Sequence, residues 1–158
     1  TGAETTQPCC PEVAENQQHV TADISFAVRN YIALTRDRAW LERGGYGLVE
    51  DMAAFWASRI ENGTSDDEDF FVINNVMGPD EDHALVNNSV YTNVAAAYAI
   101  YTAEYMNCLA DQPAPIPEEW LERGRRLKFQ ADEERRFHPQ YDGYPLGETI
   151  KQADVVLL

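Results

Sequence analysis

Residues 88–109 constrain the fold of this chain more than any other segment. Bulky apolar residues recur there at helical spacing, and alanines occupy the positions between them. The bulky members on one side are Val94, Tyr98, Tyr101 and Tyr105. A helix that is apolar almost all round is buried on more than one face. The pattern therefore predicts a central helix with neighbours on several sides, and it favours a core role for the tyrosines over a sugar-binding platform.

Three further helices are predicted around this one. Apolar residues recur at helical spacing over residues 20–34 and 48–60. Pro117 suits the first turn of a helix over residues 118–127. Asn87 or Asn88 is the expected N-cap of the central helix, because amide side chains can accept from the first free backbone N–H groups.

Shorter signals complete the pattern. Residues 1–18 show no period and are predicted to form a loop. Asp37 can cap a short helix, which Gly44 and Gly45 would end. The apolar run at residues 70–73 is typical of a short strand. The fold class is therefore predicted to be all-α with a short β insertion, and an open helical array, a bundle or a closed helical barrel would each fit.

The charge of the chain disfavours several classes of partner. Its 12 basic and 27 acidic residues give a net charge of −15, which argues against binding to nucleic acid or anionic lipid. No apolar stretch reaches the ~20 residues of a membrane span. The cysteines Cys9, Cys10 and Cys108 lack the spacing of a zinc site, so no metal is expected. Glycosylation sequons that begin at Asn62 and Asn87 leave a cytoplasmic or a secreted location open.

A carboxylic acid in a rigid turn is the first candidate for chemistry. Gly78 and Pro79 lead into Asp80, Glu81 and Asp82. Proline restricts the backbone of this turn, and like-charged neighbours favour the neutral form of a carboxyl group. A neutral carboxylic acid can protonate the leaving oxygen of a glycosidic bond. Glu81 is therefore a candidate general acid, although a solvated acidic turn would have the same local sequence.

Three sequence blocks resemble one enzyme family. They are GPDEDHALVNNSVYTN at residues 78–93, FHPQYDGY at residues 137–144 and IKQADVVLL at residues 150–158. Their wording and order resemble glycoside hydrolase family 65, which includes acid trehalases, disaccharide phosphorylases and acid-trehalase-like glucosidases. NNSVYTN and KQADVVLL are most similar to the acid-trehalase-like branch, which includes glucosidases acting on glucosyl-galactosyl-hydroxylysine. The resemblance covers essentially the whole chain.

The resemblance implies that the helices belong to an (α/α)6 toroid. The chain starts without Met and ends on an apolar run, so residues 1–158 are expected to be a fragment of the central catalytic domain, truncated at both ends. A partial toroid should expose apolar surface where its missing helices belong. The family inverts the sugar and needs no cofactor, and its catalytic base would lie beyond residue 158, so the fragment alone is expected to be inactive.

The resemblance also assigns roles to individual residues. Glu81 matches the general acid of the family, and Lys151 with Gln152 matches the pair that holds the glucose. All three must then lie at the same end of the helices. Further substrate-binding candidates are His83, Asp142 and His19. The first could bind a sugar hydroxyl or orient a carboxylate, and the second could contact substrate or merely shape a turn.

The predicted function is hydrolysis of an α-linked glucoside, either a disaccharide or a glycan, with inversion. Inversion requires a second carboxylate that activates water on the opposite face of the sugar. A disaccharide phosphorylase, which uses phosphate in place of water, is one alternative. A catalytically inactive helical module that binds carbohydrate or another protein is the other. Many relatives have an aromatic residue where this chain has Asp82, and that difference bears on substrate preference.

Overall fold

The computed structural model describes residues 11–64, 69–112 and 114–158, and Cys9 and Cys10 lie outside these ranges. The longer helices are α2 (Val20–Thr35), α4 (Tyr46–Arg59), α5 (Val90–Leu109) and α6 (Glu118–Arg125). The shorter elements are α1 (Pro11–Asn16), α3 (Arg38–Trp40), the π-helical turn η1 (Leu41–Gly45), the strands β1 (Glu61–Asn62) and β2 (Phe71–Val72), and the 3-10 turn η2 (Asp154–Leu157). All four longer helices are confirmed, with ends that differ from prediction by a residue or two.

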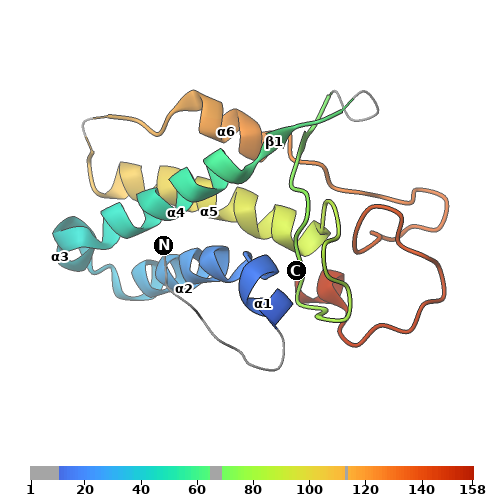
Figure 1. Ribbon diagram of the computed structural model, residues 1–158. Helices are drawn as coiled ribbons and strands as arrows, with labels where there is room; N and C mark the ends of the chain where they lie inside the picture. The colour runs from blue at the N-terminus through green and yellow to red at the C-terminus, as the bar shows by residue number, and fades with distance from the viewer. Residues whose placement is uncertain (1–10, 65–68, 113) are drawn as a thin grey trace.

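α5 lies at the centre of the helices, as its apolar sequence predicted. It contacts α2, α4, α6 and η2, and Figure 1 shows α2 and α6 on opposite sides of it. The tyrosines of α5 are only half-buried, whereas its fully buried apolar side chains are Ala96, Ala99, Ile100, Ala103 and Met106. The core role predicted for the tyrosines is therefore only partly right. Small side chains allow the neighbouring helices to pack closely against α5, and the tyrosine rings cover the edges of these contacts.

The buried face of α2 differs from the face that its bulky apolar residues predicted. Its buried residues are Ala22, Ser25, Val28 and Ile32. By contrast, Ile24 is 46% exposed and Leu34 is 85% exposed. α4 and α5 pack on the side with the smaller residues, where the Ser25 hydroxyl lies 3.5 Å from the sulfur of Met52. An apolar stripe of α2 thus remains open to solvent.

The break between α3 and α4 occurs at one glycine. The Asp37 carboxylate accepts a hydrogen bond from the Trp40 backbone N–H at 2.9 Å, which confirms the predicted cap. The first helical segment ends at Gly44, whose backbone is not helical, as predicted. The chain kinks at Gly44, whose φ is 142°, and continues directly into α4. Only glycine adopts this φ without strain, so the kink replaces a loop.

The N-cap of α5 is Ser89 and not one of the two preceding asparagines. Its hydroxyl accepts from the Thr92 N–H at 3.3 Å. Asn88 precedes the cap with a φ of 51°, and its side-chain oxygen accepts from the Ile73 N–H at 3.1 Å. Asn87 similarly accepts from the Asn75 N–H at 3.1 Å. The asparagines therefore join two loop segments, which is a use that a local pattern does not reveal.

The remaining chain forms loops that gather at one end of the helices. β1 and β2 pair as a short antiparallel ladder, which confirms the predicted β insertion. α1 forms where a loop was predicted, and its last residue, Asn16, accepts a backbone hydrogen bond from the Met77 N–H. Residues 69–88 and 126–158 lie mostly at the end of the molecule where α2 and α5 begin (Figure 1). In the described ranges, no helix is long and apolar enough to cross a membrane.

Candidate functional site

The turn that carries Glu81 projects from an anchored base. Val76 and Val86 exchange backbone hydrogen bonds of 3.0 and 2.9 Å, which closes the loop between them. Val76 and Met77 are buried, whereas Glu81 at the tip of the loop is exposed. The apolar base fixes where the loop leaves the core, so the carboxyl group is presented to solvent from a defined position.

Glu81 meets Lys151 across a long stretch of sequence. The Lys151 ammonium donates to the Glu81 carboxylate at 2.5 Å, although 70 positions separate them. The hydrogen bond and the charge of Glu81 raise the pKa of the Lys151 ammonium. Gln152 is exposed next to Lys151. The two segments predicted to share a site therefore do meet, at the end of the helices where the loops gather.

Asp80 lies inside the loop, and its partners differ from those of Glu81. Its side chain is only 1% exposed. One carboxylate oxygen contacts the His83 imidazole at 3.0 Å and accepts from the Gln140 amide at 3.4 Å. Asp80 therefore has a histidine as its neighbour, and Glu81 has a lysine as its charged partner. The like-charge environment expected for Glu81 is replaced by a contact with a cation.

His83 orients carboxylates in this arrangement. Its second ring nitrogen lies 3.3 Å from the Glu148 carboxylate, so both nitrogens face an acid. Burial lowers the pKa of the His83 imidazole, but the hydrogen bonds to Glu148 and Asp80 outweigh it, and the net pKa is raised. These contacts are those of a residue that orients carboxylates, and contact of His83 with a sugar hydroxyl stays a prediction.

A second buried carboxylate, Asp154, lies beneath the loop. It is 3% exposed, and it accepts from the Asp80 N–H at 2.7 Å. Burial raises the pKa of the Asp154 carboxyl to about 6, even though the Asp80 N–H bond lowers it. Gly78 passes directly over this carboxylate, because an added Cβ would overlap it and would lie 3.0 Å from the Ser89 hydroxyl oxygen. The glycine at this position is needed for close approach.

Aromatic rings line the loop beside His83. The rings of Tyr141 and His83 are 5.4 Å apart, and Tyr144 meets Tyr141 edge-on at 5.4 Å. The Tyr141 hydroxyl donates to Glu148 at 3.3 Å. Burial, followed by the charge of Glu148, raises the pKa of Tyr141 to about 12. Tyrosine at this site is therefore a neutral surface of apolar faces and hydroxyl groups, which is a chemistry suited to sugars.

Asp142 contacts a different set of side chains. Its carboxylate accepts from the amides of Asn88 and Gln130, each at 2.7 Å, and pairs with Lys128 at 3.0 Å. Burial raises the pKa of the Asp142 carboxyl, but these hydrogen bonds outweigh it, and the net pKa is lowered. It lines a polar hollow of about 320 Å³ with Asn74, Asn75 and Asn87. Asp142 thus ties the loop of residues 126–145 to the start of α5, as a turn-shaping residue would.

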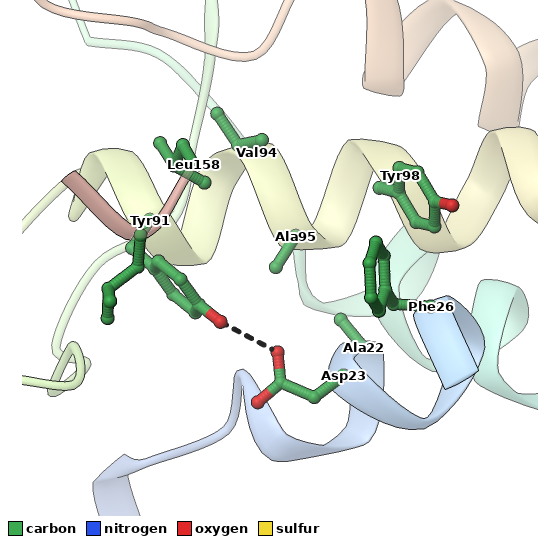
Figure 2. Close-up of a pocket in the computed structure, with 9 residues that line it drawn as sticks. Ala22, Asp23, Phe26, Tyr91, Val94, Ala95, Tyr98 and Leu158 are labelled. Atoms are coloured by element: carbon green, nitrogen blue, oxygen red, sulfur yellow. Dashed lines mark hydrogen bonds between the residues drawn. The ribbon is translucent and has the colours of Figure 1, made fainter. Parts of the chain in front are cut away.

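His19 is buried at the start of α2, at 7% exposure. One ring nitrogen lies 3.0 Å from the Asp23 carboxylate, and the ring meets Tyr91 edge-on at 5.2 Å. Asp23 also accepts from the Tyr91 hydroxyl at 3.1 Å, as Figure 2 shows. A groove of about 310 Å³ between α2 and α5 lies next to this contact, lined mainly by apolar side chains such as Phe26 and Leu158. These contacts hold the His19 ring between Asp23 and Tyr91, and substrate binding by His19 stays a prediction.

The comparison with known proteins decides the family. The sequence model of the glycosyl hydrolase family 65 central catalytic domain matches residues 3–155 of the chain. The chain belongs to glycosyl hydrolase family 65. This match confirms the resemblance drawn from the three sequence blocks. Separately, the described residues contain no cluster of histidine, cysteine or carboxylate groups that could hold a metal.

Curated members of family 65 include both hydrolytic and phosphorolytic relatives. The protein-glucosylgalactosylhydroxylysine glucosidase of Mus musculus is 40% identical over 159 residues, which cover 99% of this chain and 22% of the relative. The enzyme of the same name from Dictyostelium discoideum is 43% identical over 153 residues, or 94% of this chain and 21% of the relative. A kojibiose phosphorylase of Caldanaerobacter subterraneus is 31% identical over 185 residues, which cover 90% of this chain and 24% of the relative. The chain therefore spans between a fifth and a quarter of the length of these relatives.

A solved structure supports the fold. A protein from the human microbiome, assigned as a kojibiose phosphorylase, superposes with a TM-score of 0.63 at 20% sequence identity. The match covers 78% of this chain and 20% of the other. The helical arrangement is thus one that occurs in a longer protein.

Sequence reasoning missed the residues that support the candidate site from below. Asp154, Gln140 and Glu148 had no assigned role, and Tyr141 was noted only as part of a block. Three of them stand inside the blocks that carry the resemblance: Asp154 in KQADVVLL, and Gln140 and Tyr141 in FHPQYDGY. Their position beside the assigned residues was an available signal, but only the folded chain brings them against Asp80.

Proposed function

We propose that this chain forms part of an inverting α-glucosidase in which Glu81 is the general acid. The observation that carries the proposal is the contact between Glu81 and Lys151 at 2.5 Å across 70 positions of sequence. It unites the acid predicted in one block with the cation predicted in another. The glucosidase relatives, at 40% and 43% identity, support hydrolysis more than the kojibiose phosphorylase does at 31%.

In the proposed reaction, Lys151 and Gln152 hold the hydroxyl groups of the glucose. Both side chains are exposed, so substrate can reach them without a change in the core. When a sugar hydroxyl takes over the hydrogen bond of the Lys151 ammonium, the Glu81 carboxylate is released from the ion pair. It then takes up a proton from solvent and, as the neutral acid, transfers that proton to the glycosidic oxygen. A carboxylate outside this chain would activate water on the opposite face of the ring, and β-glucose would leave.

We further propose that residues 1–158 are a fragment of the central catalytic domain and form part of an (α/α)6 toroid. The apolar stripe of α2 supports this arrangement: Ile24 is 46% exposed, Tyr31 41% and Leu34 85%. Large apolar patches mark surfaces that pack against other protein. The small share of each relative that the chain spans, 22% of the mouse glucosidase, supports it as well.

The phosphorylase function is the second candidate, because kojibiose phosphorylases match 90% of this chain. A general acid serves both reactions, and the attacking group, water or phosphate, is what differs. The two functions therefore share the proposed roles of Glu81, Lys151 and Gln152 and differ in their products.

The test is Glu81→Gln in the full-length protein, assayed on an α-glucoside and on a glucosyl fluoride. The amide keeps the shape of the side chain but has no acidic proton to donate. We expect a loss of about 10²–10⁴-fold on the glucoside and a much smaller loss on the fluoride, whose leaving group needs little protonation. Glu133→Gln, in an exposed turn, is the control that should keep full activity.

The products separate the two functions. Hydrolysis predicts β-glucose as the first sugar released and no acceleration by phosphate. Release of glucose 1-phosphate would replace hydrolysis by phosphorolysis, and equal activity of Glu81→Gln and the wild type on both substrates would rule out the general-acid role.

A further inference from the structure

We propose that Asp154 is a positioning residue that holds the loop of the general acid in place. Asp154 is not one of the residues proposed to bind the substrate. It acts through the backbone N–H of Asp80, the residue next to Glu81. The proposal rests on the proposed function of Glu81, and it adds a residue to which the resemblance to the family assigned no role.

Asp154 belongs to a closed ring of hydrogen bonds. Its carboxylate accepts from the Asp80 N–H at 2.7 Å, and its own N–H donates to the Gln140 side-chain oxygen at 3.0 Å. The Gln140 amide completes the ring by donating to the Asp80 carboxylate at 3.4 Å. Each side chain in the ring is buried, so water does not compete for these bonds.

The ring links the two halves of the site through short stretches of backbone. Asp80 directly precedes Glu81, and Asp154 follows Lys151 by three positions. A shift of Asp154 relative to Asp80 would therefore change the separation between Glu81 and Lys151. Proton transfer in a transition state requires hydrogen-bond reach, and a misplacement of about 1 Å can lower a rate about 10²-fold.

Close packing prevents the loop from adjusting. Gly78 lies so near the Asp154 carboxylate that an added Cβ would overlap it. Burial and the charge of Asp80 oppose the ionised form of Asp154, whereas the hydrogen bond from the Asp80 N–H favours it. Burial, followed by the charge of Asp23, raises the pKa of the nearby Tyr91 hydroxyl to about 12, and the charge of Asp154 adds a smaller effect in the same direction. The place of Asp154 is thus determined by groups on α5 and the loop together.

The experiment compares leaving groups in the full-length protein. Asp154→Ala should lower kcat/KM by at least about tenfold on an α-glucoside whose leaving oxygen needs protonation, as a part of the ~10²–10⁴-fold general-acid effect. The same variant should keep nearly full activity on a glucosyl fluoride. Asp154→Asn retains an oxygen that can accept from Asp80 and should restore most of the activity on the glucoside.

Two further variants exclude a general structural effect. Gln140→Ala opens the ring from its other side and should give the same selective loss. Asp132→Ala, which removes a carboxylate of the same irregular segment that pairs with Arg135, should change neither rate. In a Glu81→Gln background, Asp154→Ala should cause no additional loss on the glucoside, because the step it supports has already been removed.

The outcomes are distinguishable. Equal losses on both substrates, or no loss on either, would overturn the positioning role of Asp154 while the selective loss of Glu81→Gln still supported the proposed function. If Glu81→Gln itself lost both activities equally or neither, the proposed function would fail, and the role of Asp154 would fall with it.

Discussion

Substituting Gly78 by alanine should loosen the loop that carries Glu81, the proposed general acid. The added Cβ would overlap the Asp154 carboxylate and approach the Ser89 hydroxyl oxygen to 3.0 Å. Keeping the loop in place would overpack a buried site, at a typical cost of about 1–3 kcal/mol. Moving the loop away would break the bond from the Asp80 N–H to Asp154, and hydrogen bonds to charged groups contribute about 1.5–3 kcal/mol. The two costs are alternatives, so we expect about 2–3 kcal/mol.

Native-state hydrogen exchange measures this effect locally. A loss of about 2–3 kcal/mol corresponds to about 30–150-fold faster exchange of the Asp80 amide. Gly47→Ala is the matched control: no atom lies within 4 Å of its added Cβ, and it stands inside α4. Alanine in a helix interior is more stable than glycine by about 0.5–1 kcal/mol, so this variant should slow exchange slightly in α4 and leave Asp80 unchanged.

A second substitution tests the cause. In an Asp154→Ala background the added methyl group of Gly78→Ala no longer meets the carboxylate, so its effect on exchange should shrink markedly. Unchanged protection of Asp80 in Gly78→Ala would refute the close packing of this loop on Asp154. An effect of the same size in both backgrounds would show that another contact is responsible.

Two further predictions concern the cap of α5 and the pH dependence of stability. Ser89→Ala removes the cap of α5 and should cost about 1 kcal/mol, read as faster amide exchange in the first turn, whereas Ser58→Ala at the far end of α4 should have no effect there. Asp154 has a pKa of about 6 when folded, against an ordinary value of 3.8, so the folded state binds its proton more tightly. Protonation of Asp154 therefore stabilises the folded state by up to about 3 kcal/mol. This contribution is fully present below about pH 4 and is lost as the pH rises through about 6. The stability of Asp154→Asn relative to the wild type should therefore increase over that interval in urea titrations, and a constant difference would contradict it.

The order of the helices could be read from the sequence because it depends on local patterns. Helical spacing of apolar residues placed α2, α4, α5 and α6, and a single carboxylate at Asp37 marked the start of α3. The all-round apolar character of α5 also placed it correctly at the centre. These features depend on backbone geometry and on contacts between residues a few positions apart. Such properties follow from the local sequence and do not require the tertiary structure.

The sequence blocks likewise predicted the meeting of Glu81 and Lys151, although only through the family resemblance. Residue chemistry alone left Glu81 as one member of an acidic turn. The pair of Lys151 and Gln152 had no meaning by itself. A local sequence pattern does not predict a contact between residues separated by 70 positions, because that contact depends on how the intervening elements pack.

Tertiary structure alone decided which groups are buried. It buried Val28 on α2 and left Leu34 exposed, because α4 and α5 approach from the side with the smaller residues. It also placed two acids, Asp80 and Asp154, inside the protein. Burial of a carboxylate is unfavourable unless hydrogen bonds and charged neighbours compensate, and those partners come from distant segments. The sequence by itself thus determined the helices and predicted the candidate site, whereas long-range packing determined the support beneath Glu81.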